Sequence, residues 1–131
     1  MNLPFFFVDH LDDRTISLDE HTSKHVLHVL RMQKGEFMLL TDGSGKKAKA
    51  SIQDDNRKKC VVEITSITAE KQRRNNVAIG ISLIKNSSRF EWFLEKATEI
   101  GVSEIIPLIC TRTEKEKLRL DRMRNIMISA M

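Results

Sequence analysis

Short apolar segments alternate with turn signals along the first half of the chain. Residues 5–8, 36–41, 47–53 and 60–67 have the apolar or β-branched composition of strands, and 47–53 also alternates polar with apolar positions. The sequence Asp42-Gly43-Ser44-Gly45 favours a tight turn, because glycine accepts positive φ angles. Four strands joined by close turns predict a small β-barrel.

One helix is expected between the first two of these strands. The sequence Ser17-Leu18-Asp19-Glu20 has the capping-box pattern, so the helix should begin near Leu18. Gly35 supplies a stop signal. The expected apolar stripe of this helix comprises Val26, Val29 and Leu30.

The second half of the chain has longer apolar runs. Residues 77–84 and 105–110 are almost entirely apolar, which is typical of strands buried on both faces of a parallel sheet. Between them, Ser87 or Ser88 is expected to cap a helix that ends at Gly101. The apolar stripe of this helix comprises Phe90, Phe93, Leu94, Ala97 and Ile100.

A second helix is expected over 114–131, and the resulting β-α-β-α order predicts a parallel sheet with right-handed crossovers. Two strands alone would leave much apolar surface uncovered, and the last helix carries no stop signal. We therefore expect an incomplete α/β domain, the front part of a longer protein. The alternative is that the chain dimerises or pairs with another chain. The polar stretch 69–76 is expected to link a first domain, 1–70, to a second, 71–131.

The composition is that of a globular protein. With 40% apolar and 31% charged residues, it excludes collagen, low-complexity sequence and wholesale disorder. The longest apolar stretch, 3–8, is far shorter than the roughly 20 residues of a membrane helix and lacks the preceding basic residues of a secretory signal. Cys60 and Cys110 are isolated, so a reducing, cytoplasmic setting is expected.

Charge is unevenly distributed between the two halves. The net charge is −1 over 1–70 and +5 over 71–131. A basic second half favours a polyanionic partner, most commonly nucleic acid, although a solvated basic face is the alternative.

The strongest candidate for a catalytic or binding site is Lys85-Asn86-Ser87-Ser88-Arg89, which connects an expected strand to an expected helix. Ligands of open α/β sheets bind beyond the carboxyl ends of strands, and helix N-termini attract anions. Lys85 and Arg89 could therefore hold a phosphate or stabilise a developing negative charge. Thr111-Arg112-Thr113-Glu114 follows the next strand and is expected to line the same crevice. The alternative is simple helix capping with a solvent-facing Arg89.

Three further groups are weaker candidates. His21, His25 and His28 share a helix face, but they lack the Glu of a zinc-protease motif, and we expect no metal site. Glu95 and Glu99 are expected to form surface ion pairs rather than an acid–base pair. The third group is a basic rim on the barrel, for which ordinary solvated side chains are the alternative; it comprises Arg31, Lys34, Lys46, Lys47, Lys49, Arg57, Lys58 and Lys59.

Two motifs resemble one enzyme family. The sequence KxxxRFEWxxEKATEIGVxxIIP at 85–107 resembles the start of the catalytic domain of the bacterial 16S rRNA (uracil-N3) methyltransferases, the RsmE family of the SPOUT superfamily. The sequence HxxHVLRxxxG at 25–35, followed by TDGSG at 41–45, resembles the PUA-like barrel of the same family.

The resemblance implies a fold and an activity. The fold would be a PUA-like, RNA-binding β-barrel followed by part of a trefoil-knotted α/β domain, and the full-length protein would be a homodimer. That protein would transfer a methyl group from S-adenosylmethionine to N3 of one uridine in 16S rRNA of the small ribosomal subunit. The cofactor-binding residues are expected beyond residue 131.

Individual residues match the family's motifs. Arg89 and Lys85 are the expected catalytic residues. Together with the basic rim, the resemblance gives an expected RNA-binding set of Arg31, Lys34, Lys46, Lys47 and Arg112. We expect this chain to be inactive alone. Two alternatives stay open: a stand-alone PUA-type RNA-binding module, and an interaction domain that recruits a partner through its exposed sheet and Met-rich last helix.

Overall fold

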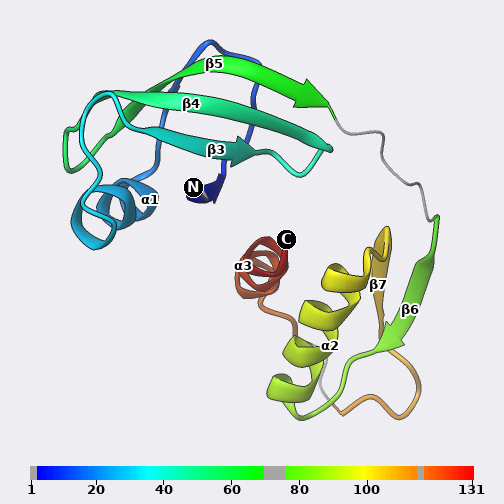
Figure 1. Ribbon diagram of the computed structural model, residues 1–131. Helices are drawn as coiled ribbons and strands as arrows, with labels where there is room; N and C mark the ends of the chain where they lie inside the picture. Colours follow the sequence, from blue (N-terminus) through cyan, green and yellow to red (C-terminus); the bar gives the residue numbers. More distant parts are fainter. Residues whose placement is uncertain (1–2, 70–75, 115–116) are drawn as a thin grey trace. The chain divides into compact units, whose positions relative to one another are not determined.

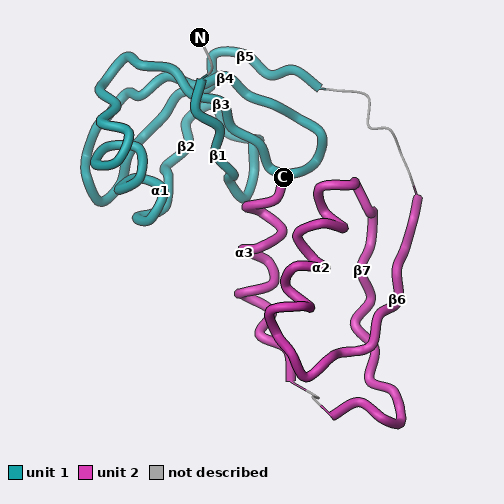
Figure 2. Tube along the Cα trace, turned by 60° about the horizontal axis from the view of Figure 1, so that its bottom comes forward, with its two compact units in different colours: residues 1–72 teal, residues 73–131 magenta. Residues whose placement is uncertain are grey.

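The computed structural model describes residues 3–69, 76–114 and 117–131. Two compact units make up the chain, unit 1 (residues 1–72) and unit 2 (residues 73–131), and each is treated by itself (Figure 2). Most of the predicted linker, 70–75, lies outside the described residues. No helix in the described ranges is long and apolar enough to cross a membrane.

A curled five-stranded sheet forms unit 1 (Figure 1). Its strand order is β1-β3-β4-β5-β2, with β1 parallel to β3 and every other neighbouring pair antiparallel. The strands are β1 (Phe5–Phe7), β2 (Thr15–Ser17), β3 (Phe37–Thr41), β4 (Lys46–Asp54) and β5 (Val61–Ala69). The four predicted strands are confirmed. Strand β2 was missed because three residues are too few to display a period.

Alternation along the strands separates an apolar inner face from a mixed outer face. In β4 the buried positions Ala48, Ala50 and Ile52 face inward, while Lys47 and Lys49 are exposed. The inner residues pack into one core. Its other buried members are Val8, Leu11, Ile16, Leu18, Val26, Met38, Leu40, Cys60 and Val62. Two register irregularities between β4 and β5 accompany the curl of the sheet.

The helix of unit 1 differs from the prediction in its start and its stripe. Helix α1 (Glu20–Lys24) is capped by the Asp19 carboxylate, which accepts a hydrogen bond from Thr22 N at 2.8 Å, so the predicted Ser17 cap was wrong. Burial raises the pKa of Asp19, but the hydrogen bonds from Thr22 outweigh it and the net pKa is lowered. A π-helical turn, η1 (His25–Val29), follows directly.

The π-helical turn changes which side chains face the core. Val26 is buried as expected, whereas Val29 is 67% exposed and Leu30 42% exposed, so that part of the predicted stripe was wrong. A π-turn has more residues per turn than the 3.6 of an α-helix, and it therefore rotates the later positions away from the core.

Unit 2 pairs two parallel strands with two helices, in the predicted β-α-β-α order (Figures 1 and 2). The elements are β6 (Ala78–Ser82), α2 (Ser87–Ile100), β7 (Glu104–Leu108) and α3 (Leu120–Ala130). Parallel pairing is confirmed. Burial of both strands on two faces is wrong, because most of their residues are exposed or half-buried in this chain. The last helix begins at Leu120 rather than 114, and residues 115–116 lie outside the described part.

The core of unit 2 centres on helix α2. Phe90 and Leu94 are buried together with Leu83 and Met123, and half-buried side chains of both strands and α3 surround them. Gly101 ends the helix at φ 89°, in the left-handed region, as predicted. Ile100 belongs to the predicted stripe but is 77% exposed, so its inclusion was wrong.

The Ser23 hydroxyl should stabilise unit 1. It is fully buried, accepts a hydrogen bond from Cys60 N at 3.0 Å and donates one to Leu18 O at 3.3 Å. Ser23→Ala leaves the Cys60 N–H without that partner, and we expect a loss of about 1–3 kcal/mol in the free energy of unfolding, measured by urea denaturation. The exposed Ser66→Ala is the control, and equal stability of the two variants would contradict this role.

The two cysteines should differ sharply in reactivity. Cys60 is buried, and burial, with smaller contributions from Asp54 and Asp55, raises the pKa of its thiol to about 11. At pH 8 roughly one such thiol in a thousand is ionised. Mass spectrometry after alkylation should therefore find exposed Cys110 modified and Cys60 intact, with both modified in denaturant. Comparable labelling rates in the native chain would contradict the buried placement.

Candidate functional site

The two loops that follow β6 and β7 lie together at the carboxyl edge, defined here by the strand ends Ser82 and Leu108. Ser82 Oγ and Thr113 Oγ1 are 2.9 Å apart, and Leu83 N donates to Leu108 O at 3.1 Å. Thr113 Oγ1 also accepts a hydrogen bond from Cys110 N at 2.7 Å. Contact between the two loops is confirmed, and a crevice lined by both stays a prediction. The hydroxyl pair was not predicted, because polar residues at two strand ends give no pairing signal.

Lys85 and Arg89 are both exposed at this edge. Lys85 Nζ lies 3.3 Å from Glu114 Oε2 of the other loop, with side chains 86% and 68% exposed. An ion pair so open to water contributes little stability, so the Lys85 ammonium can be transferred to an anionic ligand at small cost. Arg112 is exposed in the second loop.

Arg89 stands in the first turn of α2, where the unpaired backbone N–H groups give a partial positive charge. The side chain that caps this helix belongs to Asn86, whose Oδ1 accepts from Arg89 N at 3.2 Å. The predicted cap at Ser87 or Ser88 was therefore wrong. Because Asn86 fixes the backbone of Arg89, the guanidinium projects from a defined position on a 14-residue helix.

The cavity beside this edge is too small for a nucleoside. It measures about 10 Å³, close to the space for a single water molecule. Its lining residues are Leu83, Ile84, Ser87, Phe90, Lys117, Leu118 and Met123. The described residues around it therefore do not fit a nucleoside cofactor, and we assign none of them to one.

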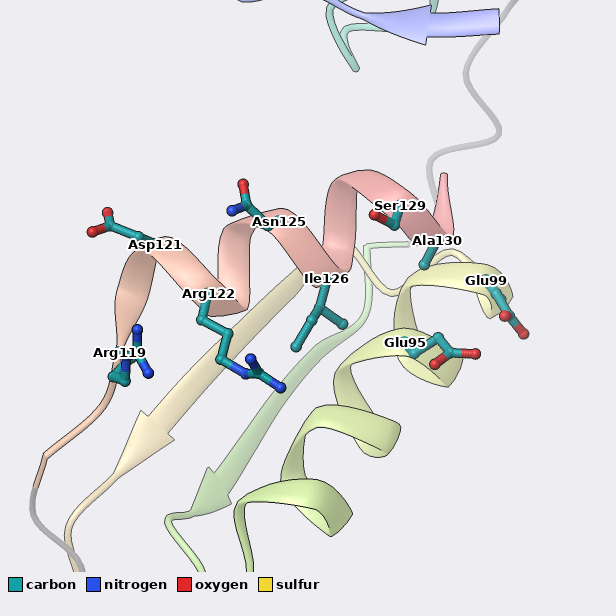
Figure 3. A pocket seen from close by; sticks show the side chains of 9 residues that line it. All are labelled: Glu95, Glu99, Arg119, Asp121, Arg122, Asn125, Ile126, Ser129 and Ala130. Atoms are coloured by element: carbon teal, nitrogen blue, oxygen red, sulfur yellow. The ribbon is translucent and has the colours of Figure 1, made fainter. Parts of the chain in front are cut away.

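A groove of about 540 Å³ separates α2 from α3 (Figure 3). Glu95 and Glu99 border it, and both carboxylates bind Lys96 Nζ, at 2.9 and 3.0 Å. The hydrogen bonds that Lys96 donates, first to Glu95 and then to Glu99, raise the pKa of Lys96. The predicted surface ion pairs are confirmed, with Lys96 of the same helix as the partner of both.

One ion pair joins the two helices across this groove. Arg122 of α3 contacts Glu91 of α2 through two bonds, Nε–Oε1 at 2.5 Å and Nη2–Oε2 at 2.8 Å. Figure 3 shows the Arg122 side chain extending from α3 toward α2. The bidentate geometry fixes the spacing of the helices, which supports the core of unit 2 from outside.

The expected RNA-binding residues of unit 1 fall into two exposed groups. Arg31 and Lys34 follow the helical segment, and Arg31 has a positive φ of 55°. Lys46 and Lys47 begin β4 after the 42–45 turn, in which Ser44 N donates to Asp42 Oδ1 at 2.9 Å. The turn is thus a hairpin loop, as its sequence predicts.

The three histidines lie along one side of the helical segment. They border a hollow of about 430 Å³ whose lining residues are His21, Lys24, His25, His28 and Val29. The His25 ring packs edge-on against Phe6 at 5.8 Å. Within the described ranges, no group of three potential ligands is arranged to hold a metal ion.

Both halves of the chain match models of RNA methyltransferase domains. The model of the RNA methyltransferase PUA domain matches residues 18–65, and that of the RNA methyltransferase domain matches 70–131. A curated relative, ribosomal RNA small subunit methyltransferase E of Bacillus subtilis, is 26% identical over 102 residues, which are 76% of this chain. The resemblance that the motifs indicated is confirmed.

Solved structures agree with this assignment. A probable rRNA methyltransferase from Porphyromonas gingivalis superposes with a TM-score of 0.90 at 35% identity and 98% coverage of this chain. Ribosomal RNA small subunit methyltransferase E from Neisseria gonorrhoeae, bound to S-adenosylmethionine, gives a TM-score of 0.79 at 27% identity and 98% coverage. The chain spans 39% of the B. subtilis protein and 54% and 55% of the two solved chains.

The Thr113 hydroxyl should hold the carboxyl edge together. Thr113→Val keeps the shape of the side chain but removes the partner of Cys110 N and Ser82 Oγ. We expect faster amide hydrogen exchange at Cys110 and a stability loss of about 1 kcal/mol. Thr111→Val in the same exposed loop is the control. Unchanged exchange at Cys110 in Thr113→Val would contradict the assignment.

Proposed function

We propose that this chain, which belongs to the RNA methyltransferase family that both of its halves match, is part of an enzyme that methylates ribosomal RNA of the small subunit. The proposed substrate atom is N3 of one uridine in 16S rRNA. One observation carries the proposal: within the segment that matches the methyltransferase domain, the parallel sheet brings Lys85 and Arg89 to the carboxyl edge.

The chemistry of uracil explains the need for cations at this edge. N3 of uridine becomes an effective nucleophile only after it loses its proton, and the negative charge then spreads onto the two neighbouring carbonyl oxygens. A guanidinium within reach of these oxygens stabilises that anion, most strongly where water is excluded. We assign this part to Arg89. Lys85 would bind the same anion or a nearby phosphate after leaving Glu114.

The proposed methyl donor is S-adenosylmethionine, which is bound to the N. gonorrhoeae relative. The cavity at the carboxyl edge does not fit a nucleoside. We therefore propose that the donor is held by residues in the part of the relatives' length that this chain does not span. The trefoil knot and the homodimer expected from the resemblance belong to the same proposal.

Unit 1 is proposed to bind the RNA that unit 2 modifies. The match of residues 18–65 to an RNA methyltransferase PUA domain supports this division of labour. Arg31, Lys34, Lys46 and Lys47 of unit 1 are exposed and suited to phosphate contacts, as is Arg112 of unit 2. Ribosomal RNA is the proposed partner and the cytoplasm the proposed location.

An RNA-binding module without catalysis is the second candidate, and the same PUA-domain match favours it. Such a module would bind RNA with a steep dependence on salt concentration, because phosphate contacts release counterions. It would not transfer methyl groups even when the chain is extended to the length of its relatives. Methyl transfer by the extended chain therefore distinguishes the enzyme from the RNA-binding module.

Arg89 should be needed for methyl transfer far more than for folding. In a protein that extends this chain to the length of its relatives, we expect Arg89→Ala to lower methyl transfer to small-subunit RNA by about 100-fold or more. Its melting temperature should hardly change, because the side chain is exposed. Nucleoside mass spectrometry would identify the product as N3-methyluridine.

The matched control is Arg119→Ala, at an exposed arginine that precedes α3. This variant should retain full turnover. Equal turnover in Arg89→Ala and the unchanged protein would remove Arg89 from the catalytic residues, and a methylated atom other than N3 would overturn the proposed substrate.

A further inference from the structure

An apolar hollow of about 610 Å³ lies in unit 1, next to the beginning of β3. Its apolar lining comprises Leu3, Pro4, Leu30, Met32 and Phe37, and Glu36 lines it as well. The site described above does not include this hollow. Its volume and its apolar lining suit a flat heterocyclic ring.

Backbone hydrogen bonds hold the walls of the apolar hollow in place. Leu39 N donates to Pro4 O at 2.8 Å, which ties the segment before β1 to β3. Met32 N donates to Val26 O at 3.0 Å, and Gly35 N to Ile52 O at 2.8 Å. The hollow is therefore preformed, so a ligand would not have to order its walls on binding.

Phe37 presents an aromatic ring at this hollow. Its neighbour Met38 points into the core, so alternation along β3 directs Phe37 to the outer face, where it is 39% exposed. Lys49 of the adjacent strand lies over the ring, with Nζ 4.4 Å from its centroid. A cation held against an aromatic ring is a combination that suits a nucleotide, since the ring stacks on the base and the ammonium meets the phosphate.

Two more cations stand next to lining residues in the sequence. Arg31 lies between the lining residues Leu30 and Met32, and Lys34 precedes Gly35; both are exposed. Among the residues that the structure describes, no carboxylate forms an ion pair with Arg31, Lys34 or Lys49. Glu36 is the one acidic residue of the lining, and its Oε2 accepts a hydrogen bond from Gln33 N at 2.7 Å.

We infer that the apolar hollow binds one unpaired base of single-stranded RNA. The base stacks on Phe37, while Arg31, Lys34 and Lys49 contact the adjoining phosphates. A cation on the Phe37 ring and two cations adjacent in sequence to the apolar lining favour a ligand that is both flat and anionic over an apolar peptide or a second copy of this basic chain. The inference rests on the proposed function, for which it names the point in unit 1 where the RNA is held.

Fluorescence anisotropy with the 131-residue chain tests this inference. The two probes are an unstructured, labelled RNA of about 12 nucleotides and an abasic ribose-phosphate chain of equal length. Phe37→Leu keeps apolar volume but removes the ring face, and we expect it to weaken RNA binding about fivefold or more. Binding of the abasic chain should be the same for both proteins, because it has no base to stack.

Further variants test the phosphate contact and provide controls. Lys49→Gln should lower the slope of log affinity against log salt by about 0.7, the value for one phosphate contact on a single strand. Lys24→Gln and Val29→Ala, exposed residues of unit 1 outside the hollow, should leave stacking unchanged. Thermal unfolding would establish that each variant is folded, and Phe37→Ala is the second variant should Phe37→Leu pack differently.

Each remaining outcome is decisive. RNA binding that is equal in the unchanged chain and both Phe37 variants would overturn the base site and leave RNA binding by the chain standing. Absence of salt-dependent RNA binding to the unchanged chain would overturn the RNA-binding part of the proposed function together with this inference. If sedimentation without RNA shows a dimer that Phe37→Leu dissociates, the hollow is an interface between copies.

Discussion

Parallel pairing of β6 and β7 is the constraint from which the candidate catalytic arrangement follows. The register joins Ala78 to Glu104 at one end and Ser82 to Leu108 at the other, so both strands finish at the same edge. Loops that are about 25 residues apart in sequence therefore meet in space, and α2 can return between them only as a crossover over the sheet. Antiparallel pairing would place these loops at opposite ends.

Two kinds of polar contact at the carboxyl edge have different consequences. The partly buried hydrogen bond between Thr113 and Ser82 joins the second loop to the first strand end, and the hydrogen bond from Cys110 N to Thr113 holds the second loop in shape. The ion pair between Lys85 and Glu114 is open to solvent, so its charges are screened and easily exchanged. A stable frame thus carries cations that remain available to an anionic ligand.

In unit 1 the two faces of one sheet have different roles: the inner face forms the core, and the outer face carries the proposed binding groups. Its inner face buries the small residues Ala48 and Ala50 in the same core as Val26 of the helical segment, and the Ser23 hydroxyl joins that segment to Cys60. Alternation then requires the intervening side chains, among them Phe37 and Lys49, to point outward. Binding groups on this outer face can vary with little effect on the core, which agrees with the RNA recognition that we propose for unit 1.

The sequence by itself determined the elements whose signals are local. Long apolar runs marked β6 and β7, the alternation in 47–53 marked β4, and Gly101 marked the end of α2, since these signals reflect backbone conformation and periodicity. Tertiary structure decided what depends on contacts between distant segments: the pairing of the three-residue β2 with β5, and the Ser82–Thr113 and Glu91–Arg122 pairs. The π-turn that exposes Val29 and the use of Asn86 rather than Ser87 as the cap are local features that the sequence pattern did not separate from their alternatives. The physical reason is that the burial and pairing of a residue depend on its partner as well as on the residue itself. A partner 31 positions away in sequence does not affect the local pattern of apolar and polar residues.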